Sequence, residues 1–220
     1  MLTLSVLDQS PVRRGGTAAE ALRETVALAQ AAERLGYARY WVSEHHNSAG
    51  FAGTAPEILI GQIAANTSRI RVGSGGVMLS HYSALKVAEQ FRILNAFYPG
   101  RIDLGIGRAP GSDQLTAAAL AYPKGIMPIE HFPRQVLDLL NYLTDQTEAE
   151  HPFASIRAQP GGRPGQCPEV WLLGSSDYSA QLAAALGLPF AFADFFGTTG
   201  GIGPAVAALY RREFKPSEYL

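Results

Sequence analysis

Only one cysteine, Cys167, occurs among the 220 residues, so the chain cannot form an internal disulfide bond. Charge is scarce and balanced as well: charged residues make up 17% of the chain and the formal net charge is -1. Because nucleic-acid binding normally requires a basic surface, this balance argues against nucleic acid as the main partner. The single cysteine favours a protein of a reducing compartment, and we expect a cytoplasmic location.

Long hydrophobic runs are also missing. No segment is long and apolar enough to span a bilayer, and the N-terminal MLTLSVLDQS lacks the basic leader and apolar core of a signal peptide. We therefore expect no membrane partner. Hydrophobic residues still make up 47% of the chain, which suits one globular domain over residues 1–220 with a substantial core.

Short apolar runs alternate with longer amphipathic stretches, a pattern typical of βα units and a parallel sheet. Candidate strands occupy residues 2–8, 38–44, 70–78, 101–109, 169–175 and 190–196. Candidate helices occupy residues 17–36, 55–67, 83–97, 130–145, 177–187 and 202–213. Residues 148–168 are rich in Gly and Pro and are predicted to form a long loop or insertion.

Polar residues and glycines gather at the carboxyl ends of the candidate strands. In chain order they are Glu44, His45, His46, Gly75, Gly76, His81, Gly107, Arg108, Gly174, Ser175, Ser176 and Asp194. In a parallel (β/α)8 barrel these ends share one face, and the loops on that face build the active site. The sequence therefore predicts an α/β fold of the TIM-barrel type with a functional site at this face.

The two adjacent histidines differ in their expected roles. Side chains alternate along an extended strand, so His45 and His46 should point in opposite directions, with one facing the barrel mouth and the other serving the structure. Adjacent histidines do not converge on one metal ion, and no HExxH or CxxC motif accompanies them. We therefore expect no metal site.

Gly75 and Gly76 interrupt an otherwise apolar strand, where glycine weakens the sheet because it has no side chain to pack. A flat ligand that approaches the backbone would explain the pair, and so would a backbone geometry that other residues cannot adopt. A bulge that bends the strand is a third explanation. The residues alone leave these alternatives open.

A phosphate pocket is predicted from two neighbouring strand ends. Residues 105–111, GIGRAPG, lack the spacing of a Rossmann fingerprint, so Arg108 either clamps an anion or forms a structural salt bridge. Ser175 and Ser176 open a helix whose free N–H groups suit a phosphate, although a serine is also an ordinary helix cap. Because the two strands are adjacent in a barrel, Arg108 and these serines should lie together.

Three segments resemble the bacterial luciferase-like flavin monooxygenase family in order and spacing: "WVSEHHN", "RVGSGGVMLSHYSALKVAEQFRILNAFYPGRIDLGIGRAPG" and "LLGSSDYSAQLAAALGLPFAFADFF". The resemblance covers nearly the whole chain. It implies a (β/α) barrel and reduced FMN supplied by a separate NAD(P)H-dependent flavin reductase. It also implies that O2 is the co-substrate and that a flavin C4a-hydroperoxide oxygenates a small organic substrate.

The same resemblance implies roles for particular residues. The family's catalytic histidine falls on His45, and its non-prolyl cis peptide, which lies under the isoalloxazine ring, falls on Gly75–Gly76. The implied cofactor-binding set is Ser74, Gly75, Gly76, Gly107, Arg108, Ser175, Ser176 and Tyr178, with the phosphate contacts around Arg108, Ser175 and Tyr178. Light-emitting members carry a reactive cysteine where this chain has Gly107, which argues against bioluminescence.

Two alternative functions stay open: an F420-dependent hydride-transfer oxidoreductase of the same fold, and a flavin-binding protein without turnover. The family normally has eight βα units, whereas six are predicted here before the terminal RREFKPSEYL. We therefore expect an incomplete barrel that lacks the last two units. Its outer strands, at residues 2–8 and 190–196, would carry unpaired backbone groups, so we expect a homo-oligomer.

Overall fold

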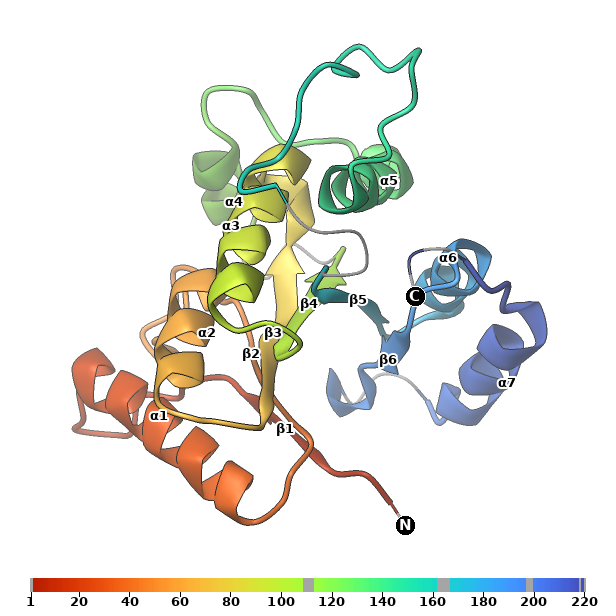
Figure 1. The fold of residues 1–220 in the computed structure, drawn as a ribbon. Helices are drawn as coiled ribbons and strands as arrows, with labels where there is room; N and C mark the ends of the chain where they lie inside the picture. The colour runs from red at the N-terminus through yellow and green to blue at the C-terminus, as the bar shows by residue number, and fades with distance from the viewer. Residues whose placement is uncertain (1, 109–112, 162–166, 197–199, 218, 220) are drawn as a thin grey trace.

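Six parallel strands form one sheet in the computed structural model, which describes residues 2–108, 113–161, 167–196, 200–217 and 219 (Figure 1). The strands are β1 (Ser5–Asp8), β2 (Arg39–Val42), β3 (Arg71–Met78), β4 (Ile102–Gly107), β5 (Glu169–Gly174) and β6 (Phe190–Phe192). Each strand pairs with the next in chain order, which leaves β1 and β6 as the two edges. The sheet curls into part of a barrel.

Seven α-helices follow the strands in the described part of the chain. They are α1 (Ala18–Arg34), α2 (Pro56–Ala65), α3 (Ala84–Phe97), α4 (Gln114–Ala121), α5 (Phe132–Thr144), α6 (Asp177–Leu186) and α7 (Gly203–Glu213), with short 3₁₀ turns at η1 (Leu79–His81), η2 (Ile129–His131) and η3 (Asp194–Phe196). The predicted α/β fold with about six βα units is confirmed. Within the described residues no helix is long and apolar enough to cross a membrane.

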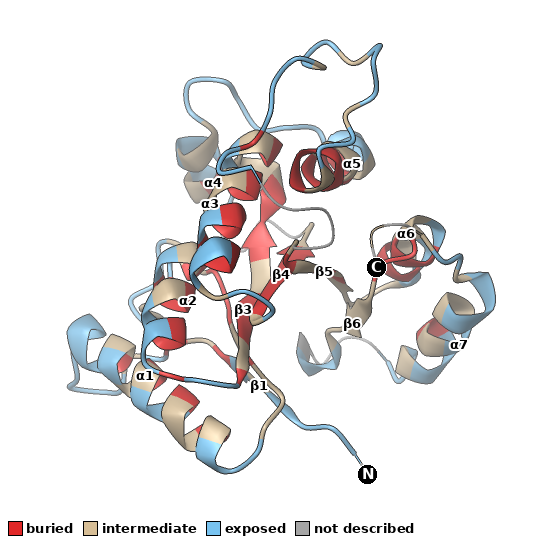
Figure 2. Cartoon of the chain, viewed as in Figure 1, coloured by how far each residue is buried: buried red, intermediate tan, exposed pale blue. Residues whose placement is uncertain are grey.

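The sheet has one face covered by helices and one that is not. Along β2 the side chains of Tyr40 and Val42 are buried under the helices, while Arg39 and Trp41 point to the other face and are half-buried. Figure 2 shows the buried residues concentrated on the strands and on the helix sides that face them. Each large apolar side chain buried there, such as Phe91, contributes roughly 1.5–3 kcal/mol to folding.

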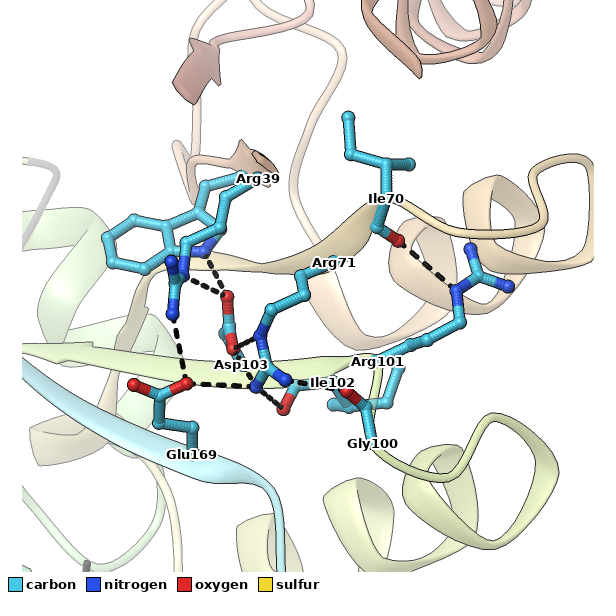
Figure 3. Close-up of polar contacts among 9 residues, drawn as sticks. Arg39, Ile70, Arg71, Gly100, Arg101, Ile102, Asp103 and Glu169 are labelled. Carbon is cyan, nitrogen blue, oxygen red and sulfur yellow. Dashed lines mark hydrogen bonds and ion pairs between the residues drawn. The ribbon is translucent and has the colours of Figure 1, made fainter. Parts of the chain in front are cut away.

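Charged side chains at the amino ends of β2 to β5 pair with one another on the uncovered face (Figure 3). The fully buried carboxylate of Asp103 accepts hydrogen bonds from Trp41 Nε1 at 2.9 Å, Arg39 Nε at 3.1 Å and Arg71 Nε at 2.8 Å. Glu169 Oε2 lies 3.0 Å from a guanidinium nitrogen of each arginine. Two cations and two anions therefore neutralise one another at this end of the strands.

One predicted element differs from the structure, and one helix was not predicted. The sixth strand stops at Phe192 rather than at residue 196, and Asp194 lies in the 3₁₀ turn η3, because the chain turns there instead of extending. Helix α4 was not predicted. Its sequence signal was present, since Asp113 precedes the helix and accepts a hydrogen bond from Thr116 N–H at 2.9 Å, as an N-cap does.

Candidate functional site

The two adjacent histidines lie in separate sets of contacts at the carboxyl end of β2. His45 Nδ1 is 3.0 Å from Ser43 Oγ, and the His45 ring stacks on Phe51 with centroids 4.6 Å apart. The His45 N–H donates to the carbonyl oxygen of Gly53 at 2.9 Å. His46 instead bonds Glu44, so the two rings have different contacts.

Glu44 is a buried carboxylate that three donors surround. Its Oε1 accepts the Tyr82 hydroxyl at 2.6 Å and lies 2.7 Å from His46 Nε2, while its Oε2 accepts the Met78 N–H at 2.9 Å. The residue is 1% exposed. Burial, together with the hydrogen bond to Glu44, raises the pKa of Tyr82 well above its usual range. Glu44 belongs to the segment WVSEHHN, but the sequence did not indicate these partners.

Burial also acts on His45. It lowers the pKa of the imidazole below its ordinary value, and the positive charge of His46 acts in the same direction, while the carboxylate of Glu44 partly offsets both. A neutral imidazole is therefore favoured near pH 7. Such a ring can take up a proton on one nitrogen or give one up from the other.

The Gly75–Gly76 peptide bond is cis, as the family resemblance implied, and the pairing of β3 with β4 shifts register between Gly75 and Val77. A Cβ atom on Gly76 would lie 2.7 Å from the carbonyl oxygen of Gly105 and 2.6 Å from Leu173 Cδ1. Of the three explanations considered for the glycine pair, the bulge and the restricted backbone geometry both apply. Neither excludes a ligand at this place.

Arg108 and Tyr178 meet across the ends of β4 and β5. The Arg108 guanidinium carbon lies 4.2 Å from the centre of the Tyr178 ring, and no carboxylate in the described part of the chain pairs with this arginine. Ser176 is the N-cap of α6, yet its side chain makes no capping hydrogen bond. The alternatives of a structural salt bridge and an ordinary serine cap are therefore both disfavoured.

Ser74 and Gly107, two further residues of the predicted cofactor site, have different surroundings: one is buried and the other is open. The Ser74 hydroxyl is buried and donates to the Gly105 carbonyl at 2.8 Å, so its side chain joins β3 to β4. At Gly107 a Cβ atom would meet nothing within 4 Å, so the space above the end of β4 is open. Residues 109–112, the remainder of the GIGRAPG segment, lie outside the described residues.

A cavity of about 350 Å³ lies beside Arg108, between the end of β4, the η1 turn and the segment that joins α4 to α5. Its lining is mostly apolar and comprises Ser80, His81, Arg108, Ala117, Ile126, Met127, Pro128, Ile129, Phe132 and Gln135. A larger groove of about 520 Å³ between α1 and α2 contains none of the predicted site residues. The cavity beside Arg108 is therefore the one that the candidate site adjoins.

At the carboxyl ends of the strands lie the His45 imidazole, the Arg108 guanidinium, which no carboxylate of the described residues pairs, and the adjoining cavity. The described residues contain no cluster of three or more His, Cys, Asp or Glu side chains suited to a metal ion. The model of the luciferase-like monooxygenase family matches residues 2–216. The chain belongs to this family.

Two named proteins are similar in sequence to most of this chain. A protein of Escherichia coli K12 called luciferase-like monooxygenase is 50% identical over 220 residues, which cover 100% of this chain and 63% of that protein. The N-acetyl-S-alkylcysteine monooxygenase of Bacillus subtilis is 49% identical over 197 residues, 89% of this chain and 58% of that protein. The chain thus spans about three fifths of the length of these relatives.

Solved structures agree with the fold. The crystal structure of apo-MsnO8 has a TM-score of 0.88 and 46% identity, and the match covers 99% of this chain and 62% of that one. The oxygenating constituent of a Pseudomonas putida 3,6-diketocamphane monooxygenase in complex with FMN has a TM-score of 0.69 at 19% identity, with 86% of this chain and 56% of that chain covered. An F420-dependent secondary alcohol dehydrogenase has a TM-score of 0.61 at 16% identity, with 83% and 55% covered. The last two show the fold alone.

Proposed function

We propose that the chain is the flavin-binding part of an FMN-dependent two-component monooxygenase. The observation that carries the proposal is the Arg108 guanidinium, which faces Tyr178 and has no carboxylate partner among the described residues. Buried or half-buried cations in proteins are normally paired, so an unpaired guanidinium beside a helix start suits an anionic ligand. The phosphate of FMN is such an anion.

The groups around Arg108 fit a phosphate. Helix α6 begins at Asp177 with its first N–H groups uncapped by the Ser176 side chain, and these N–H groups carry the positive end of the helix dipole. The hydroxyls of Ser175 and Ser176 add two more donors at this end. Arg108 would bind the phosphate oxygens, while Tyr178 keeps the guanidinium plane in place by stacking.

The ring end of the flavin would lie against the uncovered face of the sheet near Gly75–Gly76. A side chain at Gly76 would collide with Leu173 and Gly105, so the strand end stays free of side-chain bulk, and the open space at Gly107 leaves room between the two ends of the cofactor. Both FMN and F420 carry a phosphate near such a ring, so these residues accommodate either cofactor. The high identity to relatives named monooxygenases, rather than to F420 proteins, favours FMN.

His45 is the group that we assign to proton transfer. Its lowered pKa keeps the ring neutral near pH 7, and its hydrogen bond to Ser43 Oγ fixes the ring orientation. Bound reduced FMN would supply two electrons to O2, so that one oxygen atom enters the substrate and the other leaves as water. His45 would hold or move the proton that this chemistry requires.

A small organic substrate with an apolar portion suits the cavity beside Arg108, whose lining includes Ile126, Met127 and Phe132. The relative named for N-acetyl-S-alkylcysteine suggests thioethers as the first compounds to test. A flavin reductase would supply the reduced FMN transiently. We also expect self-association, because Leu2 and Leu4 beside the β1 edge are 83% and 52% exposed.

Isotope labelling tests the activity. The chain is incubated with FMN, a flavin reductase, NADH, ¹⁸O2 and N-acetyl-S-alkylcysteines, with the corresponding O-alkyl ethers as unreactive controls. One ¹⁸O atom per oxidised thioether is the expected product by mass spectrometry. Substrate turnover with reduced or oxidised F420 in the absence of O2 would instead support the hydride-transfer alternative, and flavin binding without any turnover would support the binding protein.

A further inference from the structure

Glu44 connects three separate segments at the carboxyl ends of the strands. It lies in the loop after β2, its Oε2 accepts the N–H of Met78 at the end of β3, and its Oε1 accepts the hydroxyl of Tyr82 after η1. The carboxylate is 1% exposed, so each bond forms away from bulk water. A hydrogen bond to a buried charge is stronger than one between neutral groups.

These bonds hold both neighbours of His45 in place. Glu44 precedes His45 and is itself buried, and His46 follows it with Nε2 2.7 Å from Glu44 Oε1 and 3.3 Å from the Tyr82 hydroxyl. Between these two fixed residues, the His45 N–H donates to Gly53 and the ring stacks on Phe51. The backbone of His45 is therefore held on both sides, and this backbone sets the point from which the ring reaches Ser43 and Phe51.

The same carboxylate also restrains the strand that contains the glycine pair. Met78 is two residues beyond Gly76, and the register shift between β3 and β4 ends at Val77. The bond from Met78 N–H to Glu44 Oε2 thus fixes the end of β3 directly after the irregular segment. One side chain joins the loop that carries His45 to the strand that carries Gly75–Gly76.

We propose that Glu44 is a positioning residue that sets the His45 ring relative to the Gly75–Gly76 segment. The inference rests on the role assigned to His45 in the proposed function. Glu44 acts through its neighbours and is not assigned a contact with the substrate or the cofactor. Its two oxygens are needed because three donors, from Met78, Tyr82 and His46, must be accepted at once.

The variant that tests the proposal most directly is Glu44→Gln. Glutamine has nearly the same shape as glutamate but only one acceptor oxygen, so its NH2 group must face at least one of the three donors. Histidine side-chain NMR on the flavin-free protein reports the outcome independently of turnover. We expect the His45 ring signals to shift and the ring-current effect of Phe51 to weaken. Glu169→Gln, a matched loss of a carboxylate at the opposite ends of the strands, should leave both unchanged.

The titration of His45 gives a second readout. Glu44 and His46 are the charged groups that act on the ring, and the Glu44 charge raises the pKa of His45 while burial and His46 lower it. Loss of the Glu44 charge should therefore lower the His45 pKa further, and Tyr82→Phe, which retains the charge, should not produce this change. Tyr82→Phe should still shift the His46 ring signals, because the hydroxyl lies 3.3 Å from His46 Nε2.

Activity is the third readout. In the enzyme with FMN bound, Glu44→Gln should lower kcat by about 100-fold, because a catalytic group misplaced by about 1 Å has an effect of this size. The FMN affinity should change less than about twofold. Unchanged His45 signals and stacking in a folded Glu44→Gln protein would overturn the proposal. If that variant does not fold, the test passes to Tyr82→Phe, which removes one of the three groups that hold Glu44, and unchanged His45 ring signals in that variant would overturn the proposal.

Discussion

The two ends of the parallel strands use charge in opposite ways. At the amino ends Arg39 and Arg71 meet Asp103 and Glu169, and each charge has a partner of the other sign. At the carboxyl ends Arg108 has no carboxylate partner within the described residues and stacks on Tyr178. A buried charge is costly to leave without its partner, whereas a cation without a carboxylate partner is available to an anionic ligand. The comparison separates residues that hold the strands together from residues to which we assign binding and reaction.

The largest effect is expected from His45→Ala at the carboxyl end. Loss of the proton-transfer group should lower turnover about 10²–10⁴-fold while oxidised FMN still binds. His46→Ala is the matched control. Because His46 contacts Glu44 and Tyr82, this variant should lose mainly folding stability rather than turnover. Stopped-flow kinetics and thermal melts of both variants decide the assignment, which is wrong if His46→Ala loses turnover and His45→Ala does not.

The next effect is expected at the amino end. Asp103→Ala removes the acceptor of Arg39, Arg71 and Trp41 and should lower the free energy of unfolding by about 3 kcal/mol. Glu169→Gln should cost less, because Glu169 is 30% exposed and each arginine still reaches Asp103. Urea denaturation measures both.

The Asp103 substitution also sharpens the comparison between the two ends. In the folded fraction of Asp103→Ala the FMN affinity should stay that of the wild type, because the altered group lies at the opposite ends of the strands. A selective loss of FMN binding in a fully folded Asp103→Ala protein would mean that the two ends do not act separately.

Two glycines of β4 provide a smaller and closely matched contrast. A Cβ atom on Gly105 would overlap the carbonyl oxygen of Ser74, so Gly105→Ala should destabilise the fold by about 1–3 kcal/mol. A Cβ atom on Gly107 would meet nothing within 4 Å, so Gly107→Ala should change stability by less than about 0.5 kcal/mol. Thermal melts check this order. Equal losses in both variants would contradict the close approach of β3 and β4 at Gly105.

Much of the fold could be predicted because periodic patterns depend on local sequence. The six strands and six of the helices follow from apolar runs and from stop signals such as Gly36, which adopts φ +80° after α1. Helix α4 was missed because it has only 8 residues and is flanked by Pro and Gly on both sides. The sixth strand was predicted too long because FAFADFF is apolar apart from Asp194, the residue at which the 3₁₀ turn begins.

The candidate site was predicted only in part. Strand order placed Arg108 next to the start of α6, and the contact with Tyr178 agrees with that prediction. The partners of Glu44 could not be predicted, since Met78 and Tyr82 lie 34 and 38 residues away and nothing local marks them. The same holds for Ser74, whose hydroxyl bonds the Gly105 carbonyl inside the sheet, a partner that the sequence did not indicate.

The most direct test of the account is the affinity of Arg108→Ala for FMN and for riboflavin, measured by flavin fluorescence titration beside the wild type. Riboflavin lacks the phosphate but shares the ring. If Arg108 binds the phosphate, the variant should lose roughly 10- to 100-fold in FMN affinity, the equivalent of a charge-assisted hydrogen bond or two, and retain its riboflavin affinity. Equal losses for both ligands, or no loss for FMN, would contradict the assignment of the unpaired guanidinium to the cofactor.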